Sequence, residues 1–404
     1  MKPMRFRCIA RVCLAAFTVS VCANAQEFKI FDRSVQVHGY GSQGVAYSNN
    51  NNFLTMNTSN GSPALTEGAV NISTSITDKF RVGAQGYARK IGSLDDGRPQ
   101  LDWAYGDYKF ANWFGVRAGK VKTALGLYND TQDTDFLHLW ALLPQGVYPA
   151  DLRTTYISHT GGDIYGRIPL KKAGRLDYTA YAGARSFDNR GGYFYFSEDD
   201  GFNIQSISGH MEGWDLKWTT PIKGLMLGTS WANLTMHRAG SFISGPFLGF
   251  QYTIDGNPER PWVGYGDYSR GKWEFSAEYR NTDDFDDIEF IGFGLPVMHY
   301  NQSTESWFAS AAYRVNSKLQ VGVYHSNFHV DNPANPADTA SNHIYDEVGT
   351  ARYDFNPFWD LKVEGHFMDG YGDIYSAQGF YTRWNPDGFK PRTDMLVLRT
   401  SFNF

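Results

Sequence analysis

The sequence predicts an all-β fold: a transmembrane, antiparallel, up-and-down β-barrel of about 16 strands, with its third loop folded inward. Three observations predict it. The last ten residues alternate between apolar and polar side chains, short and long connections alternate along the chain, and 16% aromatic residues accompany a negative mean hydropathy of −0.43. A chain that is polar on average yet rich in aromatics is typical of a barrel whose strands alternate lipid-facing and water-facing residues.

The segment 395–404 has the alternation of a β-strand with one apolar and one polar face. Its apolar residues share one parity and its polar residues share the other: Leu396, Leu398, Phe402 and Phe404 against Arg399, Ser401 and Asn403. A closed barrel in a bilayer needs its last strand paired and its outward residues apolar. We therefore expect this segment to close the barrel by pairing with the first strand, near 34–47.

Residues 1–25 have the pattern of a secretory signal peptide. Basic residues come first, an apolar stretch occupies 12–21, and the small-residue site Ala23-Asn24-Ala25 follows. The basic residues are Lys2, Arg5, Arg7 and Arg11. We expect this leader to be cleaved after export, which leaves 26–404 as a single barrel domain.

The mature domain lacks the residues that several function classes require. All three cysteines (Cys8, Cys13, Cys22) lie in the leader, which excludes disulfides, Cys-metal sites and a Cys nucleophile. The leader holds four basic and no acidic residues, so the formal charge of −5 becomes −9 without it. An acidic chain without a basic stripe is not expected to bind nucleic acid. The ten histidines show no metal-ligand spacing and no glycine loop precedes a helix, so neither a metal nor a cofactor is expected.

Short and long connections alternate without a break. Seven short turns contain hairpin-type residues: 77–79, 111–113, 171–175, 220–224, 270–272, 316–318 and 356–357. Eight longer polar connections lie between them: 48–65, 91–98, 125–155, 188–207, 240–257, 283–302, 331–340 and 370–391. Seven turns and eight loops imply sixteen strands, with all long loops on one side of a membrane.

Several predicted strands show which side chains face lipid. In 272–280, 360–368 and 175–185 the charged residues share one parity and the apolar residues the other. A charge facing lipid at mid-membrane costs roughly 2–4 kcal/mol, so the charged parity must face inward. The interior then holds charges of both signs, and sixteen strands leave an aqueous channel where eight would be filled by side chains.

The third long loop, 125–155, has an unusual composition. Its middle, 136–143, is apolar and aromatic, which is unexpected for a loop in water. Folding of the loop into the barrel and onto its inner wall would explain this composition. The loop would then hold four charged residues in the channel: Asp130, Asp133, Asp135 and Arg153.

The stretch 101–130, with A-Y-G-D-Y-K-F, V-R-A-G-K-V-K-T and G-L-Y-N-D, resembles the 16-stranded porins of Gram-negative outer membranes, including the anion- and phosphate-selective type. The terminal aromatic strand resembles the end of those barrels, where a C-terminal Phe is an assembly signal. The resemblance implies an outer-membrane homotrimer whose third loop forms the pore constriction. It implies as partners ions and small hydrophilic solutes, membrane lipids and lipopolysaccharide.

Basic residues cluster before the third loop: Arg81, Arg89, Arg117, Lys120 and Lys122. One interpretation is a transverse field between these residues and the loop aspartates, since rings of charge set ion selectivity. The other is a salt-bridge network that fixes the loop to the wall. Arg117 has the opposite parity to Lys120 and Lys122, so all three can face the lumen only if a bulge intervenes. The loop has three aspartates and no dense basic run, which argues against strong anion selectivity.

Two other patterns predict no site. The acidic run 283–289 lacks the spacing of a calcium loop, so a solvated loop is expected instead of a Ca²⁺ or lipopolysaccharide site. In His325-Ser326 the two side chains would point to opposite faces of a strand, which excludes a catalytic pair.

The predicted function is that of a non-enzymatic porin for passive diffusion of ions and small hydrophilic solutes. A substrate-specific channel for small anions or organic acids is the alternative, and an outer-membrane enzyme or an adhesin or receptor barrel is less favoured.

Overall fold

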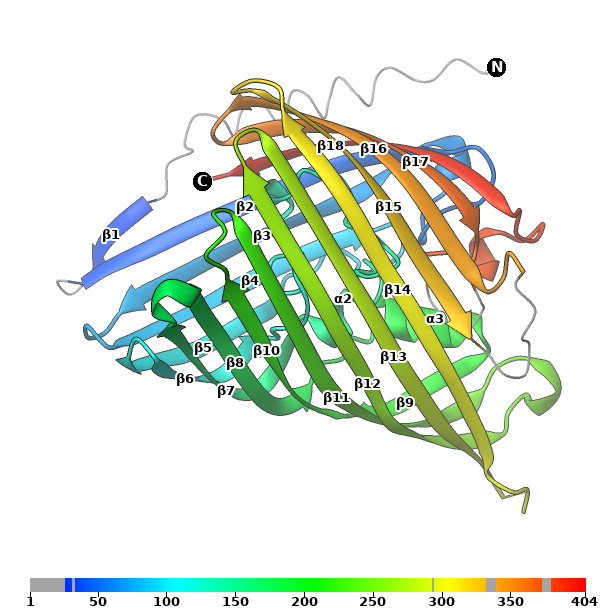
Figure 1. Cartoon of the computed structure of the whole chain (residues 1–404). Coiled ribbons are helices and arrows are strands. Elements are labelled where there is room, and N and C mark those ends of the chain that lie inside the picture. Colours follow the sequence, from blue (N-terminus) through cyan, green and yellow to red (C-terminus); the bar gives the residue numbers. More distant parts are fainter. Residues whose placement is uncertain (1–25, 31–32, 293, 332–338, 373–378) are drawn as a thin grey trace.

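The computed structural model describes residues 26–30, 33–292, 294–331, 339–372 and 379–404, which form a closed antiparallel barrel (Figure 1). The first strands are β1 (Gln26–Ile30), β2 (Arg33–Ser48), β3 (Ser62–Ser75), β4 (Phe80–Ile91), β5 (Gln100–Ala111), β6 (Phe114–Lys122), β7 (Ser158–Pro169), β8 (Arg175–Arg185) and β9 (Phe202–Ser208). The others are β10 (His210–Thr219), β11 (Leu225–Phe242), β12 (Gln251–Arg270), β13 (Trp273–Ile291), β14 (Met298–Arg314), β15 (Leu319–Asp331), β16 (His343–Asn356), β17 (Trp359–Gly370) and β18 (Arg392–Asn403).

These segments make sixteen barrel strands, as the connection pattern predicts. β9 and β10 are two parts of one barrel strand, because both pair with β11 and only Gly209 separates them. β10 also pairs with β8, which continues the ring. β1 pairs with β2 along 33–37, past the end of β18, and adds no strand to the ring.

The last strand closes the barrel against the first, which confirms the prediction from the alternating C-terminus. β18 pairs with β2 from Met395↔Ser48 to Asn403↔Tyr40. The Phe404 backbone N–H then donates to the Gly39 carbonyl (2.9 Å), and the Gly39 N–H donates to the Phe404 carbonyl (3.1 Å). The terminal residue therefore completes the backbone pairing that a lipid-embedded edge requires.

All seven short turns lie where the sequence predicts them, but two long connections are shorter than expected. The predicted loops 240–257 and 283–302 are mostly strand, and only 243–250 and 292–297 connect β11 to β12 and β13 to β14. Figure 1 shows this side of the barrel extending beyond its neighbours. The cause is apolar packing: alternate residues of these extensions, with β9, form a buried cluster that includes Phe242, Tyr252, Ile254 and Phe290.

The predicted orientation of the strand faces is confirmed. Trp273 and Phe275 on β13 are exposed, whereas Ser276 and Glu278, which follow them with the opposite parity, are buried in the interior. On β17 the apolar Val363 and Phe367 face outward, and four polar residues are almost fully buried inside: Asp360, Lys362, Glu364 and His366. Exposed apolar side chains therefore cover the outside of the barrel, as a lipid-facing surface requires.

Aromatic side chains gather on the outer surface at the end with the short turns. Ring pairs 4.2–6.5 Å apart connect neighbouring residues there: Phe80, Tyr108, Phe110, Trp113, Phe114, Tyr268, Trp273, Phe275, Tyr313, Tyr353, Phe355, Trp359 and Phe402. Aromatic girdles of this kind mark the membrane–water interface of outer-membrane barrels.

Helices are few and short. Within the described ranges they are α2 (Arg153–Tyr156), α3 (Gly192–Asp199) and five 3₁₀ turns: 58–60, 135–137, 171–173, 245–247 and 382–384. Among the residues that the structure describes, no helix has the length and apolar character needed to cross a membrane.

Candidate functional site

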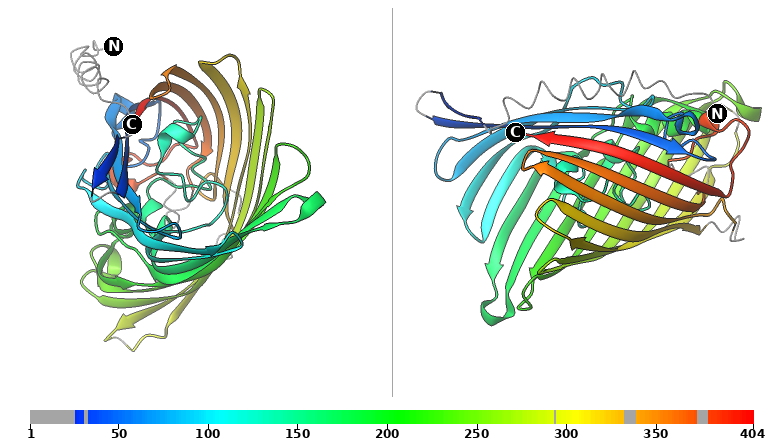
Figure 2. Two further views of the ribbon diagram at one scale, coloured as in Figure 1. Left: turned by 90° about the vertical axis from the view of Figure 1, so that its left-hand side faces the viewer. Right: turned by 90° about the horizontal axis from the view of Figure 1, so that it is seen from above.

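The connection between β6 and β7, residues 123–157, is called loop 3 here. Seen along the barrel in Figure 2 (left), it lies inside the ring of strands. It contains the 3₁₀ turn 135–137 and α2. Its residues contact inward-facing side chains of strands on several sides of the barrel. These contacts include two ionic anchors, two carboxylates that bind the loop backbone, and several apolar contacts.

The first anchor holds Asp133 against β4 and β6. The Asp133 carboxylate accepts hydrogen bonds from Lys122 Nζ (2.6 Å), Gln85 Nε2 (2.8 Å) and the Tyr40 hydroxyl (2.9 Å). Arg153, from α2, lies 3.7 Å from the same carboxylate. Burial alone would raise the pKa of Asp133, but Lys122 and Arg153 hold it well below its usual range.

Arg153 connects the end of loop 3 to the same wall. Its guanidinium donates to both oxygens of Asp102 (2.9 and 3.0 Å) and stacks 4.0 Å from the centre of the Tyr87 ring. Both the Arg153 and Asp102 side chains are almost completely buried. Both hydrogen bonds come from one guanidinium nitrogen, and such charge-assisted bonds are stronger than those between neutral groups.

The second anchor holds Asp135 against β17 and β18. Its carboxylate lies 2.9 Å from Lys362 Nζ and 3.1 Å from Arg399, and it accepts a hydrogen bond from the Ser401 hydroxyl. Lys362 also donates to the Trp140 carbonyl (3.1 Å), and Arg399 donates to the Ala141 carbonyl (2.7 Å). Burial opposes ionisation of Asp135, but the two cations lower its pKa overall.

Two wall carboxylates clamp the loop backbone. Glu364 on β17 accepts from the Ala141 and Leu142 N–H groups at 2.9 and 2.8 Å, and Glu278 on β13 accepts from the Leu127 N–H at 2.7 Å. The Tyr148 hydroxyl also donates to Glu278. These bonds satisfy backbone donors that would otherwise be buried without partners.

Apolar contacts complete the attachment of loop 3. Trp140 meets Tyr324 edge to face at 4.8 Å, and Tyr128 stacks on Phe308 at 5.9 Å. Ala141 and Leu142 belong to a larger buried cluster with residues of the β2–β3 connection. His138 is buried among these contacts, and burial lowers its pKa to about 4.

A polar cavity of about 280 Å³, the short-turn cavity, lies beside loop 3. Seven charged residues line it: Arg117, Lys122, Asp130, Asp163, Asp177, Asp215 and Lys217. Arg117 is 3.0 Å from Asp163, and Lys217 is 3.9 Å from Asp215. Asp130 forms no ion pair within the part of the chain that the structure describes. Charges of both signs therefore share one cavity.

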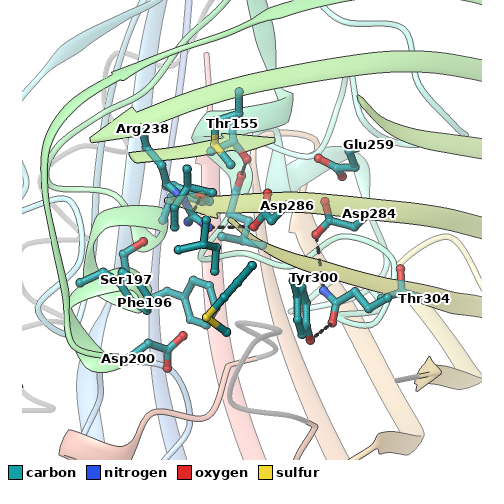
Figure 3. Close-up of a pocket in the computed structure, with 18 of the residues that line it drawn as sticks. Thr155, Phe196, Ser197, Asp200, Arg238, Glu259, Asp284, Asp286, Tyr300 and Thr304 are labelled. Carbon is teal, nitrogen blue, oxygen red and sulfur yellow. Dashed lines mark hydrogen bonds and ion pairs between the residues drawn. The ribbon is translucent and has the colours of Figure 1, made fainter. Parts of the chain in front are cut away.

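A second cavity of about 550 Å³, the outer cavity, lies toward the long loops (Figure 3). Loop 3 contributes Leu152, Thr155 and Tyr156 to its lining. The two cavities follow one another along β11. The first part of this strand pairs with β10 beside Asp215 and Lys217, which line the short-turn cavity. Ala232 and Leu234 come next, and β11 residues from Met236 onward line the outer cavity. The apolar cluster between the cavities, here called the collar, comprises Leu125, Tyr181, Met211, Ala232, Leu234, Val263 and Tyr265.

The structure separates the nine predicted site residues into groups. Asp133, Asp135, Arg153 and Lys122 belong to the two anchors, and Asp130 and Arg117 line the short-turn cavity. Arg89 forms a buried pair with Asp95 and donates to the Ala150 carbonyl of loop 3. Arg81 donates to Ser73 beside a short turn, and Lys120 donates to the Leu101 carbonyl. These last three residues lie apart from the short-turn cavity.

Arg117 and Lys122 both line one cavity despite their opposite parity. The pairing of β6 with β7 runs from Gly115 to Lys122 without a register shift, so no bulge accounts for this arrangement. Gly119 between them has a φ of 133°, outside the range that other residues favour, which interrupts the regular extended backbone.

The acidic run 283–289 is not a solvated loop. It lies on β13, where Asp284 and Asp286 line the outer cavity while Asp283 and Glu289 are exposed. Among the described residues, no group of three or more His, Cys, Asp or Glu side chains is placed to hold a metal ion. Ser326 is buried inside the barrel, whereas His325 packs against Trp307 and bonds Glu347 on the exposed side.

Sequence reasoning missed the partners on the far wall. Lys362, Arg399, Glu364 and Glu278 appear in the sequence only as inward-facing charges on their strands.

No family model and no curated protein sequence matches the chain. Solved structures do match: the outer membrane channel DcaP of Acinetobacter baumannii (TM-score 0.56, 10% identity, covering 94% of this chain and 99% of that chain); the outer membrane protein OmpT of Vibrio cholerae (0.55, 12%, 94% and 100%); and an anion-selective porin from Comamonas acidovorans (0.54, 11%, 92% and 100%). The matches extend over nearly all of each chain and concern the fold alone. The protein therefore has the fold of the 16-stranded outer-membrane porins.

Proposed function

We propose that the protein is an outer-membrane porin, a non-enzymatic channel through which ions and small hydrophilic solutes diffuse passively. The observation that carries this proposal is the short-turn cavity, in which opposed charges lie beside a loop anchored inside a closed barrel. Charged groups that line a passage are what set ion selectivity in channels.

Loop 3 is the constriction in this proposal, and its charges divide between two tasks. Asp133, Asp135 and Arg153 fix the loop to the wall, because each is buried in an ion pair. Asp130, Arg117 and Lys217 act on passing ions, because they line the cavity. In this proposal the salt-bridge network and the field on passing ions are carried by different residues, and the field arises from wall carboxylates as well as from Asp130.

The short-turn cavity contains four carboxylates and three cations. This near balance favours weak selectivity with a small preference for cations. It does not favour a channel dedicated to small anions or organic acids, for which an excess of basic residues is expected.

The location and assembly follow from the same proposal. The apolar exterior and the aromatic side chains on the outer surface at the short-turn end fit an outer membrane, with its lipids and lipopolysaccharide as surroundings. The predicted leader, 1–25, lies outside the described residues. A homotrimer is proposed because OmpT of Vibrio cholerae has a trimer form.

Planar-bilayer recordings of the purified oligomer test the proposal. We expect discrete conductance steps and, across a KCl gradient, a reversal potential on the cation side. Asp130→Asn should move that potential toward anions, whereas Asp177→Asn, at a partly exposed ion pair of the same cavity, should move it less. A protein that inserts as a folded barrel but gives no conductance steps would refute the channel function.

A further inference from the structure

The outer cavity has the lining of a binding site. Its volume of about 550 Å³ falls within the range of about 300–1,000 Å³ that is usual for small-molecule sites. Such sites combine a mainly apolar wall with a few polar groups that orient the ligand. Both features are present in the lining of this cavity, and Figure 3 shows some of its polar residues, among them Arg238, Asp284 and Asp286.

The apolar side is a cluster of aromatic rings, here called the aromatic wall: Phe202, Phe242, Phe247 and Phe290. Phe242 stacks on Phe290 with centroids 5.4 Å apart and an interplanar angle of 3°. Phe247 lies 4.8 Å from Phe290, and Phe202 lies 4.8 Å from Phe242. Flat apolar ligands gain from such rings both area burial and ring-to-ring contact.

The polar side is acidic, and most of its charges are already paired. Arg238 is held by Asp286 at 2.9 Å, and Arg185 lies 3.8 Å from Glu259. Asp284 differs: among the described residues its one hydrogen bond is from Gln302 Nε2, at 3.5 Å, and it forms no ion pair. A carboxylate can accept about four hydrogen bonds, so Asp284 retains the capacity to accept a cationic donor.

We propose that the outer cavity binds amphipathic cations, that is, small amines with a flat apolar body, and that it does so as the entry site of the proposed channel. The amine lies at Asp284 and the apolar body lies on the aromatic wall. The inference rests on the proposed function only where it makes the outer cavity an entry site for transport, because binding of the ligand requires no ion current.

A dansyl-linked primary alkylamine and its N-acetyl derivative test the proposal, because acetylation removes the charge and keeps the fluorophore. The purified oligomer is titrated with each probe at mildly alkaline pH while dansyl fluorescence is measured. The fluorescence of the probe in protein-free micelles is subtracted. We expect the amine to bind about tenfold more tightly or better, the ratio that one charge-assisted hydrogen bond provides. Equal affinity for the two probes would overturn the assignment.

Matched variants locate the site. Asp284→Asn should remove most of the preference for the amine, and Asp284→Glu should retain it. Asp283→Asn is the control, since Asp283 is adjacent on β13 but exposed on the other face. Phe242→Leu should weaken both probes alike. A full preference in Asp284→Asn, or its loss in Asp283→Asn, would overturn the proposal.

KCl conductance of the same samples separates the two proposals. Conductance steps without a preference for the amine refute the binding site alone. Probe binding without any conductance steps refutes the channel and leaves the site.

Discussion

Replacing Asp135 by asparagine should detach one side of loop 3. The carboxylate is the shared partner of Lys362 and Arg399, whose side chains are almost completely buried (0% and 8% exposed). Removing one partner of a buried ion pair leaves an uncompensated buried charge and costs about 3–5 kcal/mol. We expect Asp135→Asn to lower the free energy of unfolding by an amount in this range.

A double-mutant cycle isolates the interaction. Asp135→Asn, Lys362→Met and the double variant are compared by urea unfolding in lipid vesicles. Because Lys362→Met removes the unpaired cation that Asp135→Asn leaves behind, the double variant should cost less than the sum of the single variants by at least about 1 kcal/mol. Asp177→Asn, at the partly exposed pair with Arg167, is the control and should cost less than about 1 kcal/mol.

Single-channel recordings report the consequence for the loop. A loop that has lost this anchor should fluctuate, so we expect Asp135→Asn to add current noise and brief transitions that the parent protein lacks. A cost of less than about 1 kcal/mol for Asp135→Asn, or additivity of the two substitutions, would show that Asp135 does not anchor the loop.

Three further predictions concern the loop and the collar. The pKa of His138 is about 4 in the folded protein, against 6.5 for the ordinary side chain, so between these pH values the unfolded state binds the extra proton. Stability should therefore fall as the pH drops from 6.5 to 4, and His138→Gln should flatten that decline in unfolding measurements at a series of pH values. Parallel stability curves for the two proteins would contradict this prediction. Gly146→Cys with Phe328→Cys should form a disulfide without a change in conductance. A Cβ at Gly146 would lie 3.2 Å from that of Phe328, so a shift of a few tenths of an ångström reaches the roughly 3.5–4.5 Å of a disulfide, and the sequence has no cysteine after Cys22. Failure to oxidise would place the loop elsewhere. Leu234→Ser should raise the single-channel conductance by wetting the collar, and an unchanged conductance would show that ions take another path.

The barrel could be predicted from the sequence because its rules are local. A strand that alternates between lipid and water shows its two faces in consecutive residues, and hairpin turns show their position through glycine, asparagine and lysine. The extensions of β11 to β14 were missed for a related reason. Acidic residues at 283–289 suggest a loop, but the alternate Ile288 and Phe290 belong to an apolar cluster built with other strands.

The site was only partly predictable, because its contacts join distant parts of the chain. The composition of 125–155 identifies a loop that needs an apolar and charged environment, and Asp133, Asp135 and Arg153 do belong to the anchors. Nothing near Asp135 indicates that Lys362, 227 residues away, is its partner. The pairing depends on which strands of the closed barrel lie next to the folded loop, and no local sequence pattern indicates this.

Passage of ions through the short-turn cavity beside loop 3 is tested most directly by chemical modification in a planar bilayer. The Asp130→Cys variant is exposed to a charged methanethiosulfonate reagent while single channels are recorded, with Leu396→Cys on the outer face as control. We predict stepwise loss of current in the Asp130→Cys variant and no change in the control. Conductance that persists unaltered after demonstrated modification of the Asp130→Cys thiol would contradict ion passage through this cavity.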